Sequence, residues 1–347
     1  MPEPFRLIDG GLADGRRQVA QDAALVELHA AGRLPDTVRF LRCPPTVIVG
    51  RHQPLRREVD IARCRAEGVA LARRLTGGRA IYVDERQLGW EVAFARQRIP
   101  GPLDAVARAL CEAIAAGLSQ AFGVAARYRA RNDIEVEGRK LCVGSGCFRG
   151  DTVFYQGVLN VDLDPERVLP CLNLPGARAR VECCAAAAER MTSLRALLGT
   201  APALEAVQAA MLEGLRTRLD IETAPAEPTA EERALAARRF REEIGGDAFV
   251  FGVDAGAAPQ RTAESGPVRV DLRLEGARIR EALFTGDFRA TPPRVVFDLE
   301  ARLRDVPATQ APAVTEAFLS GARAMLALPV AQFREAVEAA LAPELAR

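Results

Sequence analysis

The sequence predicts an α+β fold: a mainly antiparallel sheet flanked by helices, followed by a small α+β unit at the C-terminus. Strand-like segments between residues 37 and 163 follow one another through tight glycine turns, which favours a meander over alternating β-α-β units. The 347 residues exceed what one hydrophobic core usually organises. A polar, proline-bearing segment at 221–230 is typical of a domain linker. We therefore expect domains at 1–224 and 225–347.

The first elements are one amphipathic helix and several short strands. Residues 17–31 place Val19, Ala23 and Val26 at helical spacing. A second helix is expected over 60–67, begun by Asp60 and ended by Gly68. Strands are expected at 37–42, 46–50, 69–74, 79–83 and 89–94.

The next stretch carries a strong helix and a hairpin series. The helix spans 103–122, and residues 126–136 are extended. Gly138 and Gly150 make turns that bracket strands at 140–148 and 152–163. Helices fill 187–218. We expect the helices to cover one side of the sheet.

The second unit begins with a helix capped by Thr229. Strands at 268–274 and 278–285 are joined by a turn at Gly276, and helices are expected near 293–304, 312–324 and 330–341. This pattern predicts a small sheet covered by helices.

Composition excludes several classes of protein. The net charge is +1, which gives no broad field for nucleic acid or an anionic membrane. No stretch approaches the roughly 20 apolar residues that cross a bilayer, and Met1 to Arg6 do not resemble a signal peptide. We expect a cytoplasmic protein with no nucleic-acid or membrane partner.

The eight cysteines favour reduced, buried thiols. No two of them have C-x-x-C spacing, and the two histidines are distant from most of them, so a zinc site is poorly supported. The vicinal pair Cys183-Cys184 has no supporting redox motif.

Lys140 is the only lysine among 47 basic residues. An ammonium group is a compact point charge on a flexible stem, whereas guanidinium is a planar fork. Phosphate-binding sites often use the point charge of a lysine ammonium group. A second candidate is the run Arg73-Arg74-Leu75-Thr76-Gly77-Gly78-Arg79-Ala80-Ile81-Tyr82, where two glycines and flanking donors are suited to an anion.

With these segments the chain resembles the lipoate–protein ligase and octanoyltransferase family, a relative of biotin ligases. The family has an Arg-Arg-x-Thr/Ser-Gly-Gly stretch, and then an Arg-Asn-Asp segment followed by a Gly-x-Lys turn. Here the second motif is Arg131-Asn132-Asp133 with Gly138-Arg139-Lys140. A third, Tyr155-Gln156-Gly157, is similar to the strand that closes over the acyl-adenylate.

The resemblance extends to the second unit. Residues 268–272, the turn after them and Thr285-Gly286-Asp287-Phe288 are similar to the accessory domain of lipoate ligases. Together the motifs cover nearly the whole chain.

The resemblance implies an ATP-dependent ligase that forms lipoyl-AMP and transfers the lipoyl group to a lysine of an acceptor protein. Lys140 would be the catalytic charge clamp between acyl oxygen and α-phosphate. Asp133 would hold Mg²⁺, with Asn132 beside it. The implied ligand-binding residues are Arg74, Thr76, Gly77, Gly78, Arg79, Ala80, Tyr82, Asn132, Asp133, Gln156 and Gly157.

Departures from the family pattern leave alternatives open. Arg79 replaces a third glycine, and Val83-Asp84 replaces a usual His-Asp, which affects the expected contact with adenine. Octanoyltransferases use a cysteine nucleophile, which one branch places shortly before the lysine, where this chain has Ala130-Arg131-Asn132. Cys142, Cys147 and later cysteines keep a cysteine-dependent octanoyl or lipoyl transferase open. A non-catalytic acyl-binding module is the third alternative.

Arg79 and the strand around Gln156 are also similar to ligases associated with sulfur oxidation. The implied acceptor is a lipoyl domain, a glycine-cleavage H-like protein or a dedicated lipoate-binding protein. The sequence does not choose among these acceptors or between lipoate and octanoate. We expect a monomer, which suits an enzyme that admits a protein substrate.

Overall fold

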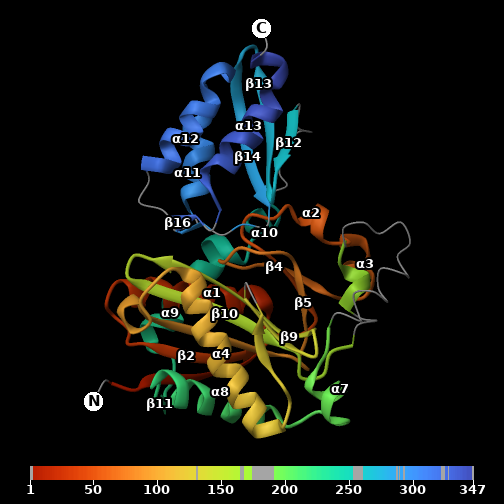
Figure 1. The fold of residues 1–347 in the computed structure, drawn as a ribbon, viewed down its shortest axis with the longest axis vertical. Helices are drawn as coiled ribbons and strands as arrows, with labels where there is room; N and C mark the ends of the chain where they lie inside the picture. The colour runs from red at the N-terminus through yellow and green to blue at the C-terminus, as the bar shows by residue number, and fades with distance from the viewer. Residues whose placement is uncertain are drawn as a thin grey trace.

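The computed structural model describes residues 3–129, 132–164, 168–173, 191–252, 261–286, 288, 290–291, 294–321, 325–326 and 328–345. Arg131, Cys183, Cys184 and Asp287 lie outside these ranges, as do parts of the helices expected at 187–218, 293–304 and 312–324. Figure 1 shows a larger N-terminal unit and a smaller C-terminal unit above it.

An eight-stranded sheet forms the centre of the larger unit. Its order is β11-β1-β2-β6-β10-β9-β8-β7. β1 runs parallel to both β11 and β2, and all other neighbours are antiparallel. The strands are β1 (Phe5–Leu12), β2 (Thr37–Arg42), β6 (Leu88–Ala95), β7 (Arg127–Arg129), β8 (Asp133–Val136), β9 (Arg139–Arg149), β10 (Thr152–Leu159) and β11 (Thr223–Pro225). The predicted mainly antiparallel sheet is confirmed.

Helices cover both faces of this sheet, which corrects the expectation of one covered side. On one face, α4 (Leu103–Phe122) and α8 (Leu204–Leu219) enclose the main core around Trp90. On the other, α1 (Gly15–Ala30) packs over Ala93 and Phe154, and α9 (Ala230–Arg239) packs on α1. The reason is that β6 carries mainly apolar side chains on both faces of the sheet, and every residue of the strand except its last is buried.

Glycines allow α4 and α8 to cross closely. A Cβ added at Gly117 would lie 2.0 Å from the carbonyl oxygen of Ala210, and one at Gly214 would lie 2.1 Å from that of Ala113. Short 3-10 and α segments complete this unit: Arg96–Arg98, Leu169–Cys171 and α7 (Leu194–Leu198).

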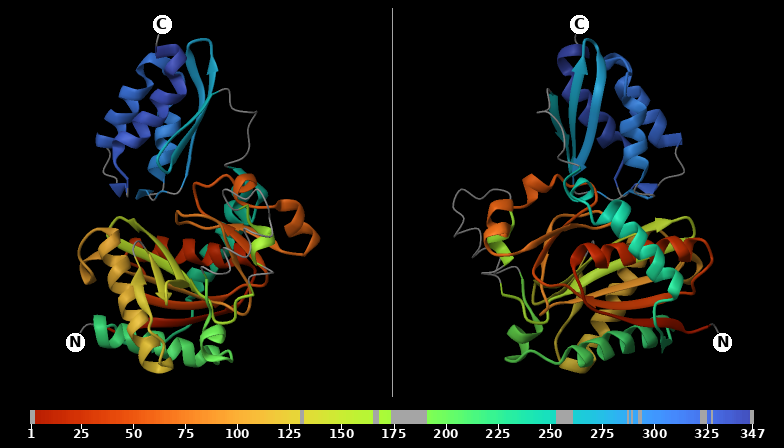
Figure 2. Two further views of the ribbon diagram at one scale, coloured as in Figure 1. Left: turned by 45° about the vertical axis from the view of Figure 1, so that its right-hand side comes forward. Right: turned by 180° about the vertical axis from the view of Figure 1, so that it is seen from behind.

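A three-stranded sheet lies beside the α1 face of the large sheet (Figure 2). It consists of β3 (Thr46–Val49), β4 (Ala70–Arg73) and β5 (Ile81–Val83), in the order β4-β3-β5. Two short helices, α2 (Leu55–Glu58) and α3 (Ile61–Ala66), pack against it. Asp60 accepts a hydrogen bond from the Arg63 amide at the start of α3, as its position before the helix predicts.

The segment expected as a linker contributes to the larger unit. Residues 223–225 form β11 in the main sheet, and Thr229 and Glu232 form a reciprocal capping box at the start of α9. Beyond α9, a π-helical turn (Phe240–Ile244) and α10 (Asp247–Phe251) pack against α1 and β4. The second hydrophobic core therefore begins only at β12.

The smaller unit is a three-stranded antiparallel sheet with helices packed against it (Figure 1). Its elements are β12 (Arg261–Ser265), β13 (Val268–Glu275), β14 (Arg278–Gly286), β15 (Ala290–Thr291), α11 (Arg294–Leu303), a 3-10 turn (Ala308–Gln310), α12 (Ala311–Gly321), β16 (Met325–Leu326) and α13 (Val330–Leu345). Its core includes Phe284, Phe288 and Phe333. The ring of His52 stacks on Phe288 at 5.3 Å, which joins the two units.

Candidate functional site

The turn after β4 connects the small sheet to the large one. Thr76 and Gly77 lie in this turn, and both bond to the large sheet. Gln156 Nε2 donates to Thr76 Oγ1 at 2.8 Å, and Ser145 Oγ donates to the carbonyl oxygen of Gly77 at 3.0 Å. Gly78 has φ +97°, a conformation that favours glycine. The Arg-Arg-Leu-Thr-Gly-Gly run is therefore held at fixed points above the strands β9 and β10.

The two arginines of this run are buried and bonded to backbone carbonyl groups. Arg74 is 6% exposed and donates to the carbonyl oxygens of Ile48, Gly77 and Arg79. Arg73 is 1% exposed and donates to the carbonyl oxygens of Gly50, Gln53 and Val250, among others. Both guanidinium groups thus fix the shape of the turn, and Arg73 also ties it to α10.

The remaining predicted residues of this segment point in different directions. Arg79 is half exposed and pairs with Glu58 at 3.3 Å, and the amide of Ala80 donates to the same carboxylate at 3.2 Å. Tyr82 is buried in the core of the small sheet, between Ile81 and Val83, which line a cavity. The structure therefore separates Tyr82 from the other residues of the site.

Lys140 and Asp133 are neighbours on adjacent strands. Lys140 Nζ lies 2.9 Å from Asp133 Oδ2, and the Lys140 side chain is 38% exposed. A register shift between Ile134 and Glu135 in the pairing of β8 with β9 brings the two side chains to the same face of the sheet. Asn132 bonds instead to Gly144: its side-chain amide donates to the Gly144 carbonyl, and its own carbonyl oxygen accepts from the Gly144 amide at 2.9 Å.

A cavity of about 70 Å³ lies between the two sheets. Its walls come from β2, β6, β9 and β10 of the large sheet, β3 and β5 of the small sheet, and the first half of α1. Arg74, Gln156 and Gly157 line it, whereas Lys140 lies three residues before the lining residue Val143 on β9. Arg74, which precedes the glycine-bearing turn, thus lines the cavity, and Lys140 lies on the strand that supplies the lining residues Val143 and Ser145.

The strand register arranges the cavity-facing side chains in rows. Arg39, Glu91, Gln156 and Ser145 are consecutive partners across β2, β6, β10 and β9; we call them the polar row. Leu41, Gly89, Val158 and Val143 form the next row, the apolar row. Directly paired residues project to the same face of a sheet. Every member of the two rows except Arg39 lines the cavity.

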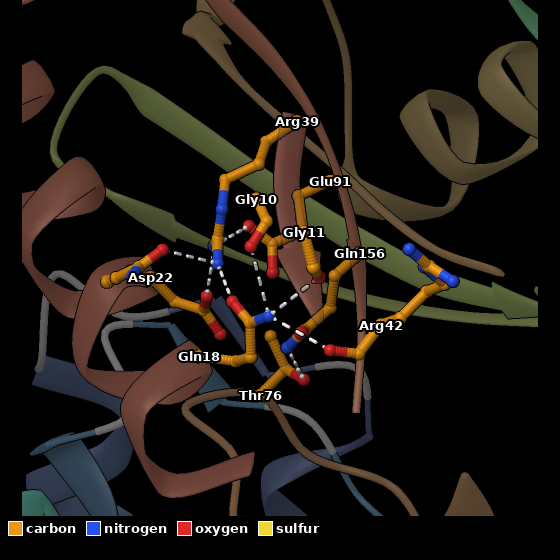
Figure 3. Close-up of polar contacts among 10 residues, drawn as sticks. Gly10, Gly11, Gln18, Asp22, Arg39, Arg42, Thr76, Glu91 and Gln156 are labelled. Carbon is orange, nitrogen blue, oxygen red and sulfur yellow. Dashed lines mark hydrogen bonds and ion pairs between the residues drawn. The ribbon is translucent and has the colours of Figure 1, made fainter. Parts of the chain in front are cut away.

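A buried ionic cluster surrounds Arg39 in the polar row (Figure 3). Arg39 Nη1 donates to Asp22 Oδ1 and to Glu91 Oε2, each at 2.8 Å, and Nη2 donates to Gln18 and Gln21. Burial raises the pKa of Glu91 well above its usual value and also raises that of Asp22, although the Arg39 charge opposes both shifts. Burial therefore disfavours the form of the cluster in which both carboxyl groups are ionised.

Six thiols within the described ranges are buried and free of disulfides: Cys43, Cys64, Cys111, Cys142, Cys147 and Cys171. Burial raises the pKa of Cys147 to about 12 and raises that of Cys142 as well. A hydrogen bond from Cys64 lowers the pKa of Cys171, which is 0% exposed. The two thiols nearest Lys140 in sequence are therefore poor nucleophiles.

Sequence reasoning missed the Asp22, Arg39 and Glu91 cluster. One signal was present: Glu91 is the single charged residue in the apolar strand Leu88–Ala95, and Arg39 alternates with apolar residues in β2. A charged residue on a buried strand requires a partner. The identity of that partner depends on tertiary packing, because Asp22 lies on a helix.

Within the ranges that the structure describes, no cluster of three or more His, Cys, Asp or Glu side chains is placed to hold a metal ion. Among those same residues, every helix is too short or too polar to cross a bilayer.

Known proteins are similar to this chain in sequence and in fold. Residues 14–216 match the family model for the lipoyl protein ligase A/B catalytic domain. The chain is 32% identical over 261 residues to the octanoyltransferase LipM of Kyrpidia tusciae, which covers 67% of this chain and 94% of that protein.

Three solved structures have the same fold. A bipartite lipoate protein ligase of Thermoplasma acidophilum, studied with its E2 lipoyl domain, is 23% identical with a TM-score of 0.66 and covers 72% of this chain and 96% of that one. Lipoate-protein ligase A bound with ATP is 23% identical with a TM-score of 0.64, over 72% and 99%. LipL1 of P. falciparum in complex with lipoate is 12% identical with a TM-score of 0.70, over 96% and 98%.

The last of these spans both units of this chain, so the α+β fold with a C-terminal domain is confirmed. The sequence match extends over more than half of the chain and contains the glycine-bearing turn, the Lys140–Asp133 pair and the cavity between the sheets. The chain belongs to the family of lipoyl protein ligase A/B catalytic domains.

Proposed function

We propose that the protein is an ATP-dependent lipoate–protein ligase. The observation that carries this proposal is the position of the Lys140 ammonium, which is accessible and lies on the strand β9 that lines the cavity together with Arg74, the residue that precedes the glycine-bearing turn. The cavity is the proposed acyl site, and the turn is the proposed phosphate site. Lipoate and ATP are the proposed substrates, since similar folds were solved with each of them.

The cysteines favour the ligase over a transferase. In the resembling transferases, one branch places its nucleophile shortly before the lysine, where this chain has Ala130-Arg131-Asn132. Cys142 and Cys147 are buried thiols with raised pKa values. A thiolate is the reactive form, and these environments disfavour it.

In the proposed reaction, a carboxylate oxygen of lipoate attacks the α-phosphorus of ATP and pyrophosphate leaves. Negative charge grows on the oxygens around that phosphorus. Lys140 moves from Asp133 to these oxygens and stabilises them, which a flexible stem permits. Thr76, Gly77 and Gly78 supply a rigid turn against the phosphate. A neutral lysine amine of the acceptor then attacks the acyl carbon, loses a proton, and AMP leaves.

Asp133 is the proposed Mg²⁺ residue. Its carboxylate is 16% exposed, is bonded to Lys140 in this structure and has Asn132 next to it. One carboxylate fits Mg²⁺, which commonly takes its other ligands from phosphates and water. When bound, the ion would neutralise phosphate charge. Arg79 and Ala80 stay proposed as ligand contacts, with Arg79 the more accessible of the two. Tyr82 is no longer proposed, because its side chain is buried in the core of the small sheet.

The proposed protein substrate is a small domain that carries the lysine to be lipoylated. One similar fold was studied with an E2 lipoyl domain, and the transferase relatives point to the same class of carrier. A glycine-cleavage H-like protein and a dedicated lipoate-binding protein, such as the sulfur-oxidation subgroup would use, are the other candidates.

The test is acyl transfer to a purified lipoyl domain, with lipoate, Mg²⁺ and either ATP or no nucleotide. We expect AMP release and a lipoyl mass gain on the acceptor lysine, in equal amounts and with ATP only. Transfer from an octanoylated carrier without ATP would overturn the proposal.

That second outcome would identify a cysteine-dependent transferase, which the octanoyltransferase relatives favour. Single Cys→Ser changes at Cys142, Cys147 and Cys171 and at the vicinal pair Cys183-Cys184 would then locate the nucleophile. For a ligase, all of these variants retain ATP-dependent transfer.

A further inference from the structure

The proposed acyl site is apolar at one end and polar at the other, and the same four strands supply both ends. Near Lys140, its floor is the apolar row of Leu41, Gly89, Val158 and Val143. One step farther along each strand it meets the polar row, where Glu91, Gln156 and Ser145 face the cavity. Asp22 and Gln18 of α1 line the same part.

The polar row is the inner end of the cavity. Beyond it lies a third row of directly paired residues, Thr37, Ala93, Phe154 and Cys147, all of them buried, and the last three pack with α1. In the other direction along β9, Val143 and then Lys140 follow Ser145 toward the half-exposed ion pair. The five residue steps from Lys140 to Ser145 span roughly 16 Å of strand. An eight-carbon acid and the Lys140 side chain together cover this distance.

The groups at the inner end are hydrogen-bonding groups in a nearly dry place. Glu91, Asp22 and Gln18 are each 2% exposed. Arg39 bonds to both carboxyl groups, and burial raises the pKa of Glu91. The wall is thus polar, with both donor and acceptor atoms.

We infer that Glu91 and the polar row select an acyl chain whose far end carries sulfur over a plain alkyl chain of the same length. This inference rests on the proposed acyl site. It predicts that the protein prefers lipoate to octanoate, unlike the octanoyltransferases that it resembles in sequence.

The physical reason lies in what each chain end offers to the wall. Glu91 bonds to Arg39 and the amide of Gln156 bonds to Thr76, so a terminal methyl group placed against them covers only their remaining oxygen lone pairs, and this costs free energy. A dithiolane ring is polarisable, and its sulfur atoms accept weak hydrogen bonds. Specificity arises here from the penalty on the wrong chain as much as from the bond to the right one.

The test compares binding of lipoate and octanoate by titration calorimetry, without ATP or acceptor. Three proteins are used: wild type, Glu91→Gln and Glu91→Leu. Glu91→Gln keeps a hydrogen-bonding group of the same shape. Glu91→Leu removes it and leaves Arg39 paired with Asp22, so the remaining charges still balance.

In the wild type we expect lipoate to bind at least about ten-fold more tightly than octanoate, a ratio within the range that single pocket contacts provide. Glu91→Gln should retain most of this ratio. Glu91→Leu should reduce it to about two-fold, mainly by binding octanoate more tightly. Circular dichroism confirms that each variant is folded.

Equal affinities for the two acids in the wild type, or an unchanged ratio in Glu91→Leu, would overturn the inference alone. Failure of the wild type to bind either acid would overturn the inference together with the acyl site. Because no ATP is present, the result does not depend on whether the protein is a ligase or a transferase.

Discussion

Two groups of cations and carboxylates lie on the same sheet and differ in their exposure to water. The Lys140 and Asp133 side chains are 38% and 16% exposed, whereas Arg39, Asp22 and Glu91 are 3–4% exposed. A half-exposed ammonium loses little when it exchanges one anionic partner for another. A buried guanidinium cannot leave its carboxylates without leaving uncompensated charge. The accessible Lys140–Asp133 pair can therefore take part in a reaction, whereas the buried Arg39 cluster can fix the shape of a binding wall.

The comparison predicts the largest loss of stability for Arg39. Arg39→Met should lower the free energy of unfolding by about 3–5 kcal/mol, because it leaves two buried carboxyl groups without a cation. Urea denaturation measures the effect.

Arg63→Met is the matched control, since Arg63 is 49% exposed in its pair with Glu67. It should change the free energy of unfolding by less than about 1 kcal/mol. Equal losses in the two variants would mean that burial does not separate the two kinds of ion pair.

A second effect of intermediate size depends on pH. Because the folded state raises the pKa of Glu91 above 4.5, its stabilising contribution is complete below that value and is lost as pH rises toward the higher folded pKa. Glu91→Gln mimics the protonated acid and does not titrate. The stability of the wild type should therefore fall relative to Glu91→Gln from pH 5 upward, by about 1.4 kcal/mol per pH unit at most. Parallel pH profiles of the two proteins would disprove the raised pKa.

The smallest expected effect is on the stability of a Lys140 variant. Lys140→Met should change the free energy of unfolding by less than about 1 kcal/mol, because the ion pair with Asp133 is partly solvated. Thermal denaturation in low and high salt checks this. A loss comparable to that of Arg39→Met would assign Lys140 a structural role and remove the contrast between the two groups.

Local pattern predicts much of this fold. Helices at 103–122 and 60–67, the hairpins around Gly138 and Gly150, and the Thr229 cap all follow from spacing and turn residues. The pairing of β11 with β1 does not, because a three-residue strand at 223–225 is defined only by the distant strand that it joins. For the same reason, the polar segment at 221–230 resembled a linker although it contributes to the main sheet.

The candidate site divides in the same way. Contiguous motifs predict Thr76, Gly77 and Lys140 as site residues, and Lys140 is in addition the only lysine of the chain. The motif does not predict that the guanidinium of Arg74 bonds to backbone carbonyl groups, or that Tyr82 lies in the hydrophobic core of the small sheet. It also could not bring Asp22 of α1 beside Glu91 of β6, since that contact depends on how a helix packs across the sheet.

The most direct test of the account is lipoate-dependent exchange of pyrophosphate into ATP by the wild type and Lys140→Arg, without any acceptor. We expect exchange in the wild type and a loss of about 100-fold or more in Lys140→Arg, because a planar fork replaces a point charge at the α-phosphate. Binding of lipoate should survive in the variant. Absence of exchange in the wild type, or near-normal exchange in Lys140→Arg, would contradict adenylation by this site with Lys140 as its charge clamp.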